Sequence, residues 1–151
     1  MIKFESKEQD LVITFPTQVI ASLQKHRQTG NMNESGGMLF TNDLESSDVL
    51  VSYASMPTAS DKRGKWFFKS NTKSTQSIIR KQFKKGHHYI GDWHSHSEKN
   101  PYPSPKDKRT FKQVFSESEH QLRFMAMLIL GSEKEFSNSY VSLIDKDNIY
   151  R

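Results

Sequence analysis

Two histidines separated by one residue are the strongest chemical signal in the sequence. His94 and His96 lie in the segment 89–96, which reads as a β-strand. Because alternate residues of a strand point to the same face, both imidazoles leave one face, with backbones about 6–7 Å apart. Side chains of that reach can bind one metal ion at nitrogen-to-metal distances of about 2 Å. The pair alone is not decisive, because two partly exposed histidines on a strand give the same pattern.

A carboxylate that could complete a metal site follows a proline-containing loop. Ser104 and Asp107 belong to the sequence Ser-Pro-Lys-Asp, which has the form of a helix start with Ser as N-cap and Pro at the first helical position. The loop 98–103 can bring this turn beside the end of the strand. There Asp107 would supply an oxygen ligand of a kind that zinc accepts. A plain helix cap produces the same spacing.

Two other carboxylates compete for the same role. Asp92 precedes His94 by two residues and therefore shares its face of the strand, while Glu98 follows His96 by the same distance. Either could be a ligand in place of Asp107, and Asp92 could instead orient an imidazole. Periodicity alone does not separate these options.

Glu34 is the candidate for proton transfer. Three protein ligands would leave the fourth tetrahedral position for water, which is typical of a catalytic rather than a structural zinc. Such an ion lowers the pKa of its water from 15.7 toward ~7, and a general base must still carry the proton to the leaving group. Glu34 stands just before Gly36 and Gly37, where backbone can approach closely. In isolation it would be an ordinary loop carboxylate.

The composition excludes several kinds of catalytic and metal site. The chain has 151 residues and no cysteine, which excludes disulfides, thiolate zinc ligands and cysteine nucleophiles. The cysteine ligands of zinc nucleobase deaminases are therefore missing, as is the His-Glu-x-x-His motif of thermolysin-like proteases. The N-terminus is charged, and the longest apolar run, 124–130, is too short for a membrane span. We expect a single cytoplasmic domain over residues 1–151.

Positive charge is concentrated in one part of the chain. Residues 61–85 contain nine Lys or Arg and one acidic residue, so they carry +8 while the remainder carries −3. A solvated helix face would explain this pattern. A nucleic-acid-binding domain is a further option, but no motif of that kind accompanies the charge. We predict that the stretch flanks the substrate groove and contacts an acidic patch on a protein partner.

The elements that must position these residues are strands mixed with helices. Strands are predicted at 11–15, 36–40, 49–53, 89–96, 123–130 and 140–144, with an extended segment at 66–68. Helices are predicted from Pro16 to about residue 28, from Ser70 or Asn71 to about residue 85, and from Ser104 onward. Residues 57–65 and 98–103 are expected to be loops. This content predicts an α/β domain with a mixed β-sheet flanked by helices.

Taken together, the spaced residues resemble the JAMM signature of the JAB/MPN metalloprotease family. The family pattern is a distant Glu, then His-x-His, seven residues, Ser, two residues and Asp. The matching positions are Glu34, His94, His96, Ser104 and Asp107, with the same spacing. The Glu-x-Gly-Gly context at 34–37 and the Gly-Asp-Trp at 91–93 are also similar to the family, and the resemblance spans about residues 10–145.

The resemblance implies a JAB/MPN-like fold and a role for each matching residue. It implies that Zn²⁺ is bound by His94, His96 and Asp107, which selects Asp107 over Asp92 as the third ligand. Glu34 would deprotonate the bound water and later protonate the leaving amine. Ser104 would donate a hydrogen bond to the oxyanion. One departure is Ser97, where family members usually carry Pro; this could loosen the turn after the strand but removes no catalytic group.

The resemblance also implies a substrate class. The family cleaves isopeptide or peptide bonds after the C-terminal tail of ubiquitin or a ubiquitin-like protein, and the tail binds as an added strand. Small stand-alone bacterial members resemble the deconjugating peptidases of CBASS-type anti-phage operons, where E1/E2-like enzymes attach a nucleotidyltransferase through its C-terminus. The alternative is a non-catalytic MPN-type interaction module. Such relatives have usually lost a ligand or the Glu, whereas all five positions are present here.

Overall fold

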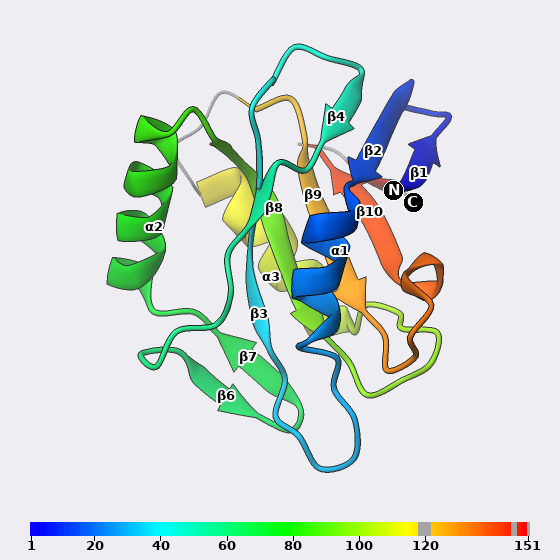
Figure 1. The fold of residues 1–151 in the computed structure, drawn as a ribbon, viewed down its shortest axis with the longest axis vertical. Coiled ribbons are helices and arrows are strands. Elements are labelled where there is room, and N and C mark those ends of the chain that lie inside the picture. Colours follow the sequence, from blue (N-terminus) through cyan, green and yellow to red (C-terminus); the bar gives the residue numbers. More distant parts are fainter. Residues whose placement is uncertain (118–121, 146–147, 151) are drawn as a thin grey trace.

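A six-stranded mixed sheet forms the centre of the fold (Figure 1). The computed structural model describes residues 1–117, 122–145 and 148–150. In the order of the sheet, the strands are β11 (Ile149–Tyr150), β10 (Tyr140–Ile144), β9 (Met125–Leu130), β8 (His88–Ser95), β3 (Gly36–Thr41) and β5 (Tyr53–Ala54). Strands β8 and β9 are parallel, and the other neighbours are antiparallel. The predicted mixed sheet is therefore confirmed.

Two smaller sheets accompany the central one. The first has the order β1-β2-β4, with β1 (Ile2–Ser6) antiparallel and β4 (Asp48–Leu50) parallel to β2 (Leu11–Phe15). The second is a hairpin of β6 (Lys62–Gly64) and β7 (Phe67–Lys69), which we call the β6–β7 hairpin. It lies beside the start of β3 (Figure 1).

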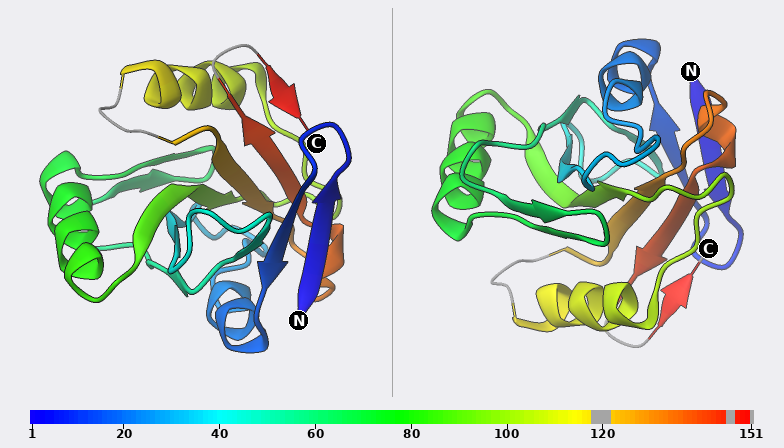
Figure 2. Two further views of the ribbon diagram at one scale, coloured as in Figure 1. Left: turned by 90° about the horizontal axis from the view of Figure 1, so that it is seen from above. Right: turned by 90° about the horizontal axis from the view of Figure 1, so that it is seen from below.

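Among the described residues, three α-helices flank the central sheet, together with the short 3₁₀ helix η1 (Phe136–Asn138). Figure 2 shows that α1 (Thr17–Gln24) and α3 (Pro105–Glu117) lie on opposite faces, while α2 (Thr72–Lys84) stands beside the sheet. Helix α2 begins at the predicted cap, because the side chain of Asn71 accepts a hydrogen bond of 3.0 Å from the Ser74 amide. No helix in the described ranges is long and apolar enough to cross a membrane.

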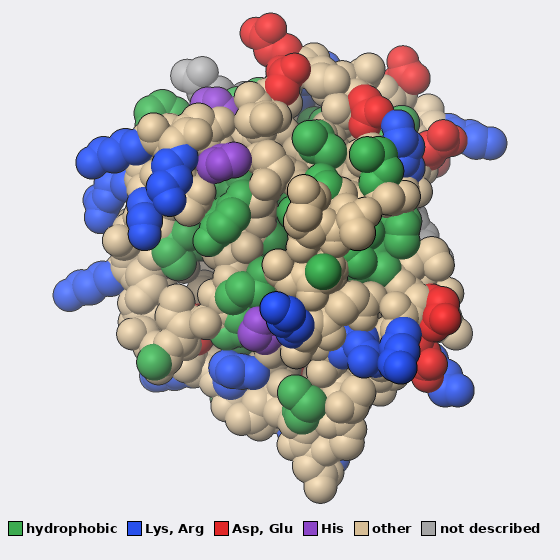
Figure 3. All heavy atoms as spheres, viewed as in Figure 1, with side chains coloured by type: hydrophobic (Ala, Val, Ile, Leu, Met, Phe, Trp, Pro, Cys, Tyr) green, Lys and Arg blue, Asp and Glu red, His purple; other side chains and the backbone are tan. Residues whose placement is uncertain are grey.

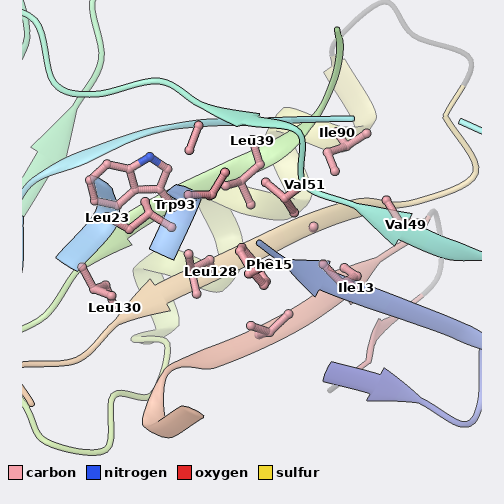
Figure 4. Packing of buried hydrophobic residues seen from close by; sticks show 14 of the residues in the cluster. Ile13, Phe15, Leu23, Leu39, Val49, Val51, Ile90, Trp93, Leu128 and Leu130 are labelled. Carbon is pink, nitrogen blue, oxygen red and sulfur yellow. The ribbon is translucent and has the colours of Figure 1, made fainter. Parts of the chain in front are cut away.

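Strand β9 joins the two halves of the hydrophobic core, and all six of its residues are buried. Because side chains alternate along a strand, one set faces α1 and the other faces α3. The first set, Ala126, Leu128 and Leu130, packs with Phe15 and Leu23 (Figure 4). The second set, Met125, Met127 and Ile129, packs with Phe111. Each large side chain buried in this way contributes roughly 1.5–3 kcal/mol.

Strand β8 uses the same alternation to separate its core residues from its site residues. Trp93 is almost fully buried in the α1-side core, and its indole N–H donates to the Ser55 carbonyl at 2.8 Å. Its neighbours Asp92 and His94 pair with Met127 and Ile129, which belong to the α3-side core. Asp92 and His94 therefore face α3.

Several predicted elements have different bounds or neighbours. Helix α1 ends at Gln24 rather than near residue 28. Beyond the helix, the buried Gln28 donates from its amide to the carbonyls of Met32 and Lys65 and so connects this stretch to the β6–β7 hairpin. The predicted strand 49–53 is divided, because β4 pairs with β2 whereas β5 pairs with β3.

The β6–β7 hairpin and strand β1 also correct the sequence-based expectations. Residues 57–65 were expected to form a loop, but Lys62–Gly64 form a strand that pairs with Phe67–Lys69. Strands of three residues are too short to show a period, and Lys65-Trp66 is not a typical two-residue turn. Strand β1 was not predicted, because Lys3 and Glu5 interrupt its apolar residues.

Candidate metal centre

The two histidines converge on the first turn of α3. The Nε2 atom of His94 lies 3.4 Å from Oδ2 of Asp107, and the Nε2 atom of His96 lies 3.2 Å from the same oxygen. One ligand atom from each residue lies within 4.8 Å of the other two. These spacings suit nitrogen and oxygen ligands that share one ion at bond lengths of about 2 Å. The structure thus brings together the three side chains proposed as ligands.

A reciprocal cap fixes the position of Asp107. The Ser104 amide donates to Oδ2 of Asp107 at 2.9 Å, and the Asp107 amide donates to the Ser104 hydroxyl oxygen at 3.0 Å. Pro105 occupies the first helical position, where its missing N–H costs no hydrogen bond. The predicted helix start is confirmed, and it holds one carboxylate at the end of β8.

The donor set fits a metal ion. The Nε2 atom of His94 is buried and has no hydrogen-bond partner within the described chain, although it faces Asp107. Burial alone would raise the pKa of Asp107, but the imidazoles of His94 and His96 and the Ser104 amide hold that pKa well below its usual range. A carboxylate with a lowered pKa beside two imidazole nitrogens is a donor set that a divalent cation can bind.

His96 stands between three carboxylates. Burial acts to lower its pKa, but the negative charges of Asp107, Glu34 and Glu98 outweigh burial and raise it. Its Nε2 atom faces Asp107 and Glu34, while Nδ1 lies 3.6 Å from an exposed carboxylate oxygen of Glu98. Glu98 therefore sits on the side of the ring away from the cluster, where it can orient the imidazole.

Asp92 lies on the expected face of β8 but outside the cluster. Its Oδ1 atom accepts a hydrogen bond of 3.0 Å from the Tyr89 hydroxyl. Burial raises the pKa of Asp92 to about 6, although the Tyr89 hydroxyl and His94 act in the opposite direction. Of the carboxylates that competed in the sequence, the geometry favours Asp107 over both Asp92 and Glu98 as a ligand.

Glu34 lies close to the cluster formed by His94, His96 and Asp107. Its Oε1 atom lies 3.8 Å from Nε2 of His96, and the residue is only 8% exposed. Burial raises the pKa of Glu34 above its ordinary value, and the nearby His94 and His96 partly oppose this. A carboxylate with a raised pKa is a better proton acceptor and donor near neutral pH than an exposed one.

The five side chains share one cavity of about 490 Å³, which Glu34, His94, His96, Ser104 and Asp107 all line. The lining continues onto the β6–β7 hairpin through Trp66, Phe67 and Phe68, and onto α2 through Ile78. The basic segment 61–85 thus borders this cavity. A cavity of this size with a mainly apolar wall and a few polar groups at one end is typical of a substrate site.

Residues that connect Glu34 to the hairpin were missed in the sequence. Arg63 donates from Nε to the Glu34 carbonyl and from Nη2 to the Ser35 hydroxyl, both at 2.8 Å. Arg63 was not singled out because it is one of nine Lys and Arg residues in the stretch 61–85, and nothing in the sequence distinguishes it from the other eight. Gly64, placed one residue before the turn, was the one local signal of a hairpin.

Comparisons with known proteins identify relatives of this chain. Three curated proteins, each named "CD-NTase/cGAS isopeptidase", are similar to this chain. The protein from Enterobacter hormaechei is 26% identical over 91% of this chain and 77% of its own length. The protein from Pseudomonas aeruginosa is 20% identical over 85% of this chain and 84% of its length. The protein from Vibrio cholerae is 27% identical over 85% of this chain and 81% of its length.

A solved structure shows the same fold. The solution structure of a Desulfitobacterium hafniense protein superposes with a TM-score of 0.66 at 22% identity, covering 92% of this chain and 89% of that one. The sequence model of the family described as prokaryotic homologs of the JAB domain matches residues 16–142, which includes all five site residues. This protein therefore belongs to the prokaryotic JAB-domain family.

Proposed function

We propose that this protein is a zinc-dependent isopeptidase. It would hydrolyse the isopeptide or peptide bond after the C-terminal tail of a ubiquitin-like protein, or of a protein conjugated by an E1/E2 pathway. The observation that carries the proposal is the approach of Glu34 to within 3.8 Å of His96, on the same ring nitrogen that faces Asp107. Family membership supports hydrolysis, and the three relatives, each named an isopeptidase, support deconjugation. The place of this activity in anti-phage defence is part of the proposal.

The ligands of the proposed zinc are His94, His96 and Asp107. Two neutral imidazoles and one carboxylate are a donor set that zinc accepts in hydrolytic enzymes, and three ligands leave one position for solvent or substrate. When bound, zinc supplies Lewis acidity and makes hydroxide available near neutral pH. The five side chains that would surround the reacting bond all line the cavity.

Glu34 and Ser104 would do the proton and hydrogen-bond chemistry. The Glu34 carboxylate accepts the proton of the attacking water and then gives it to the departing lysine or backbone amine. The Ser104 hydroxyl oxygen already accepts a hydrogen bond from the Asp107 amide, so its own proton is free to point elsewhere. That O–H would donate to the oxyanion formed on the substrate carbonyl.

The tail of the substrate would lie along the β6–β7 hairpin. Trp66 and Phe67 are 75% and 44% exposed, and both line the cavity that leads to Glu34. A flexible C-terminal tail can bind in extended form beside a strand, with backbone hydrogen bonds for affinity and side-chain pockets for specificity. The aromatic residues of the hairpin would supply those pockets.

The test is cleavage of model conjugates by zinc-loaded protein. The substrates are tails of a ubiquitin-like protein and of a CD-NTase, each joined to a lysine side chain or fused linearly to a reporter. Glu34→Gln should lower kcat by roughly 10²–10⁴-fold without loss of zinc, because the amide cannot transfer the proton. The matched control is Glu45→Gln, an exposed residue outside the cavity, which should leave cleavage unchanged. Full activity of Glu34→Gln, or of metal-stripped protein, would reject the proposal.

A further inference from the structure

The backbone around Glu34 is held mainly by the β6–β7 hairpin. The Glu34 amide donates to the Gly64 carbonyl at 2.8 Å, and Arg63 donates to the Glu34 carbonyl and to the Ser35 hydroxyl, each at 2.8 Å. Ser95, at the end of β8, forms the remaining bonds shown for this segment, all of them with Ser35. Glu34 itself is thus fixed through residues 63 and 64.

Glu34 needs this support because it lies outside the sheet. Strand β3 begins at Gly36, where pairing with His94 starts, so the Glu34 backbone has no ladder hydrogen bonds of its own. The carboxylate must nevertheless enter the cavity and reach the edge of His96. A side chain carried by an unpaired residue is only as well placed as the contacts that hold its backbone.

Arg63 suits this task because of its geometry. A guanidinium is planar and presents several donors in a fixed fork, so two bonds to adjacent residues fix both distance and orientation. One bond goes to the carbonyl that follows the Glu34 side chain, and the other goes one residue further along the chain. The hairpin end is also anchored by Gln28, whose amide donates to the Lys65 carbonyl at 2.8 Å.

We propose that Arg63 is a positioning residue, which acts through the backbone of Glu34 and Ser35 to hold the Glu34 carboxylate in its reactive place. This rests on the proposed function, because it assigns Arg63 to the same hydrolytic site. The β6–β7 hairpin therefore has two functions. Trp66, Phe67 and Phe68 line the cavity, and Arg63 holds the backbone that carries the general base. Arg63 does not touch the reacting atoms and binds no metal.

The test compares Arg63→Ala, Arg63→Lys and the control Arg109→Ala on one model conjugate. Arg109 is exposed on α3 and outside the cavity, so its loss removes the same charge without affecting Glu34. Arg63→Ala should lower kcat by roughly 10- to 100-fold, because displacement of a catalytic group by about 1 Å has effects of that size. KM and zinc content should stay near wild type. Arg63→Lys, with one donor point in place of a fork, should be intermediate.

Chemical rescue separates positioning from general stability. Guanidinium added at concentrations far below those that unfold proteins should restore part of the kcat of Arg63→Ala, whereas urea or sodium chloride at equal concentration should not. A higher KM with unchanged kcat would overturn the proposal and make Arg63 a substrate-binding residue. A fall in melting temperature large enough to account for the loss of activity, with no rescue by guanidinium, would also overturn it. If the wild type cleaves nothing, or Glu34→Gln stays active, the failure lies in the proposed function instead.

Discussion

At the scale of single residues, the carboxylate of Asp107 serves the helix and the metal site at once. Its Oδ2 atom accepts the Ser104 amide at 2.9 Å and faces both imidazoles at 3.2 and 3.4 Å. A carboxylate oxygen has more than one lone pair, so a cap and a ligand can use the same atom. The cap therefore holds the proposed ligand in place before any ion binds, which limits the entropy lost on binding.

Ser104 combines two roles that substitution can separate. Ser104→Ala removes both the hydroxyl donor and the N-cap, whereas Ser104→Gly removes the donor but weakens the cap by only a few tenths of a kcal/mol. We expect both variants to lower kcat by a similar factor, roughly 10²–10³-fold, as for other oxyanion donors. Only the Ala variant should lose about 1 kcal/mol of unfolding free energy. Paired kinetics and thermal unfolding measure both quantities.

An opposite pattern would identify a purely structural serine. If Ser104→Gly keeps wild-type kcat while Ser104→Ala loses activity together with stability, the hydroxyl acts only as a cap. The present geometry allows the two roles together, because the Asp107 amide uses an acceptor site of the hydroxyl and leaves its donor unused.

At the scale of elements, two glycines at the start of β3 admit two different neighbours. A Cβ atom on Gly36 would overlap the ring of Phe68 from the β6–β7 hairpin. A Cβ atom on Gly37 would overlap the Ser55 carbonyl and the Trp93 indole, which are joined by their own hydrogen bond of 2.8 Å. The sequence indicated a close approach at this point, and the structure shows that hairpin and core approach from separate sides.

Substitution of these glycines should have distinct effects. Gly37→Ala meets a backbone carbonyl, which cannot move without loss of the Trp93 bond, and should cost about 1–3 kcal/mol of unfolding free energy. Gly36→Ala meets an aromatic side chain that can shift, so its main effect should be displacement of the hairpin and a lower kcat. Thermal unfolding and kinetics distinguish them. Equal stability of Gly37→Ala and wild type would show that β3 adjusts freely there.

Most long elements could be predicted because each carries a local signal. Strand β10 and strand β2 have the predicted bounds, and α3 begins at the predicted cap. The hairpin could not be predicted, since its strands are three residues long and its support of Glu34 comes from Arg63 and Gly64, about thirty residues away in sequence. Hydrogen bonds between such distant segments leave no periodic trace in the sequence.

At the scale of the whole molecule, the candidate site is a product of sheet order. Strand β3 pairs with β8 so that Gly36 lies opposite His94, which brings the Glu34 segment beside the histidines. The motif alone was enough to select the five candidate site residues from the sequence. The choice among Asp92, Glu98 and Asp107 by geometry required the structure, because it depends on how α3 returns to the end of β8.

The distribution of surface charge is also a property of the whole molecule. Helix α2 contains no acidic residue, and Lys and Arg side chains gather over it at the upper left of Figure 3. We call the exposed set Lys73, Arg80, Lys81, Lys84 and Lys85 the basic face of α2. Phe83 of the same helix is 63% exposed. Ile78 of the same helix lines the cavity, so we expect a protein substrate bound there to reach the basic face of α2.

Reversal of this charge should weaken capture of an acidic substrate protein without slowing its cleavage. Lys81, Lys84 and Lys85 changed together to Glu should raise KM by roughly tenfold at low salt and leave kcat unchanged, because rim charges act mainly on encounter. The difference should shrink at about 0.5 M salt, where the Debye length is only a few ångströms.

The control reverses the exposed Lys7, Lys25 and Lys134, which lie outside the cavity lining and carry the same total charge. Equal KM values for the two triple variants would show that net charge, rather than the basic face of α2, governs binding. Salt-dependent binding of RNA or DNA that the α2 variant alone loses would assign this face to nucleic acid instead.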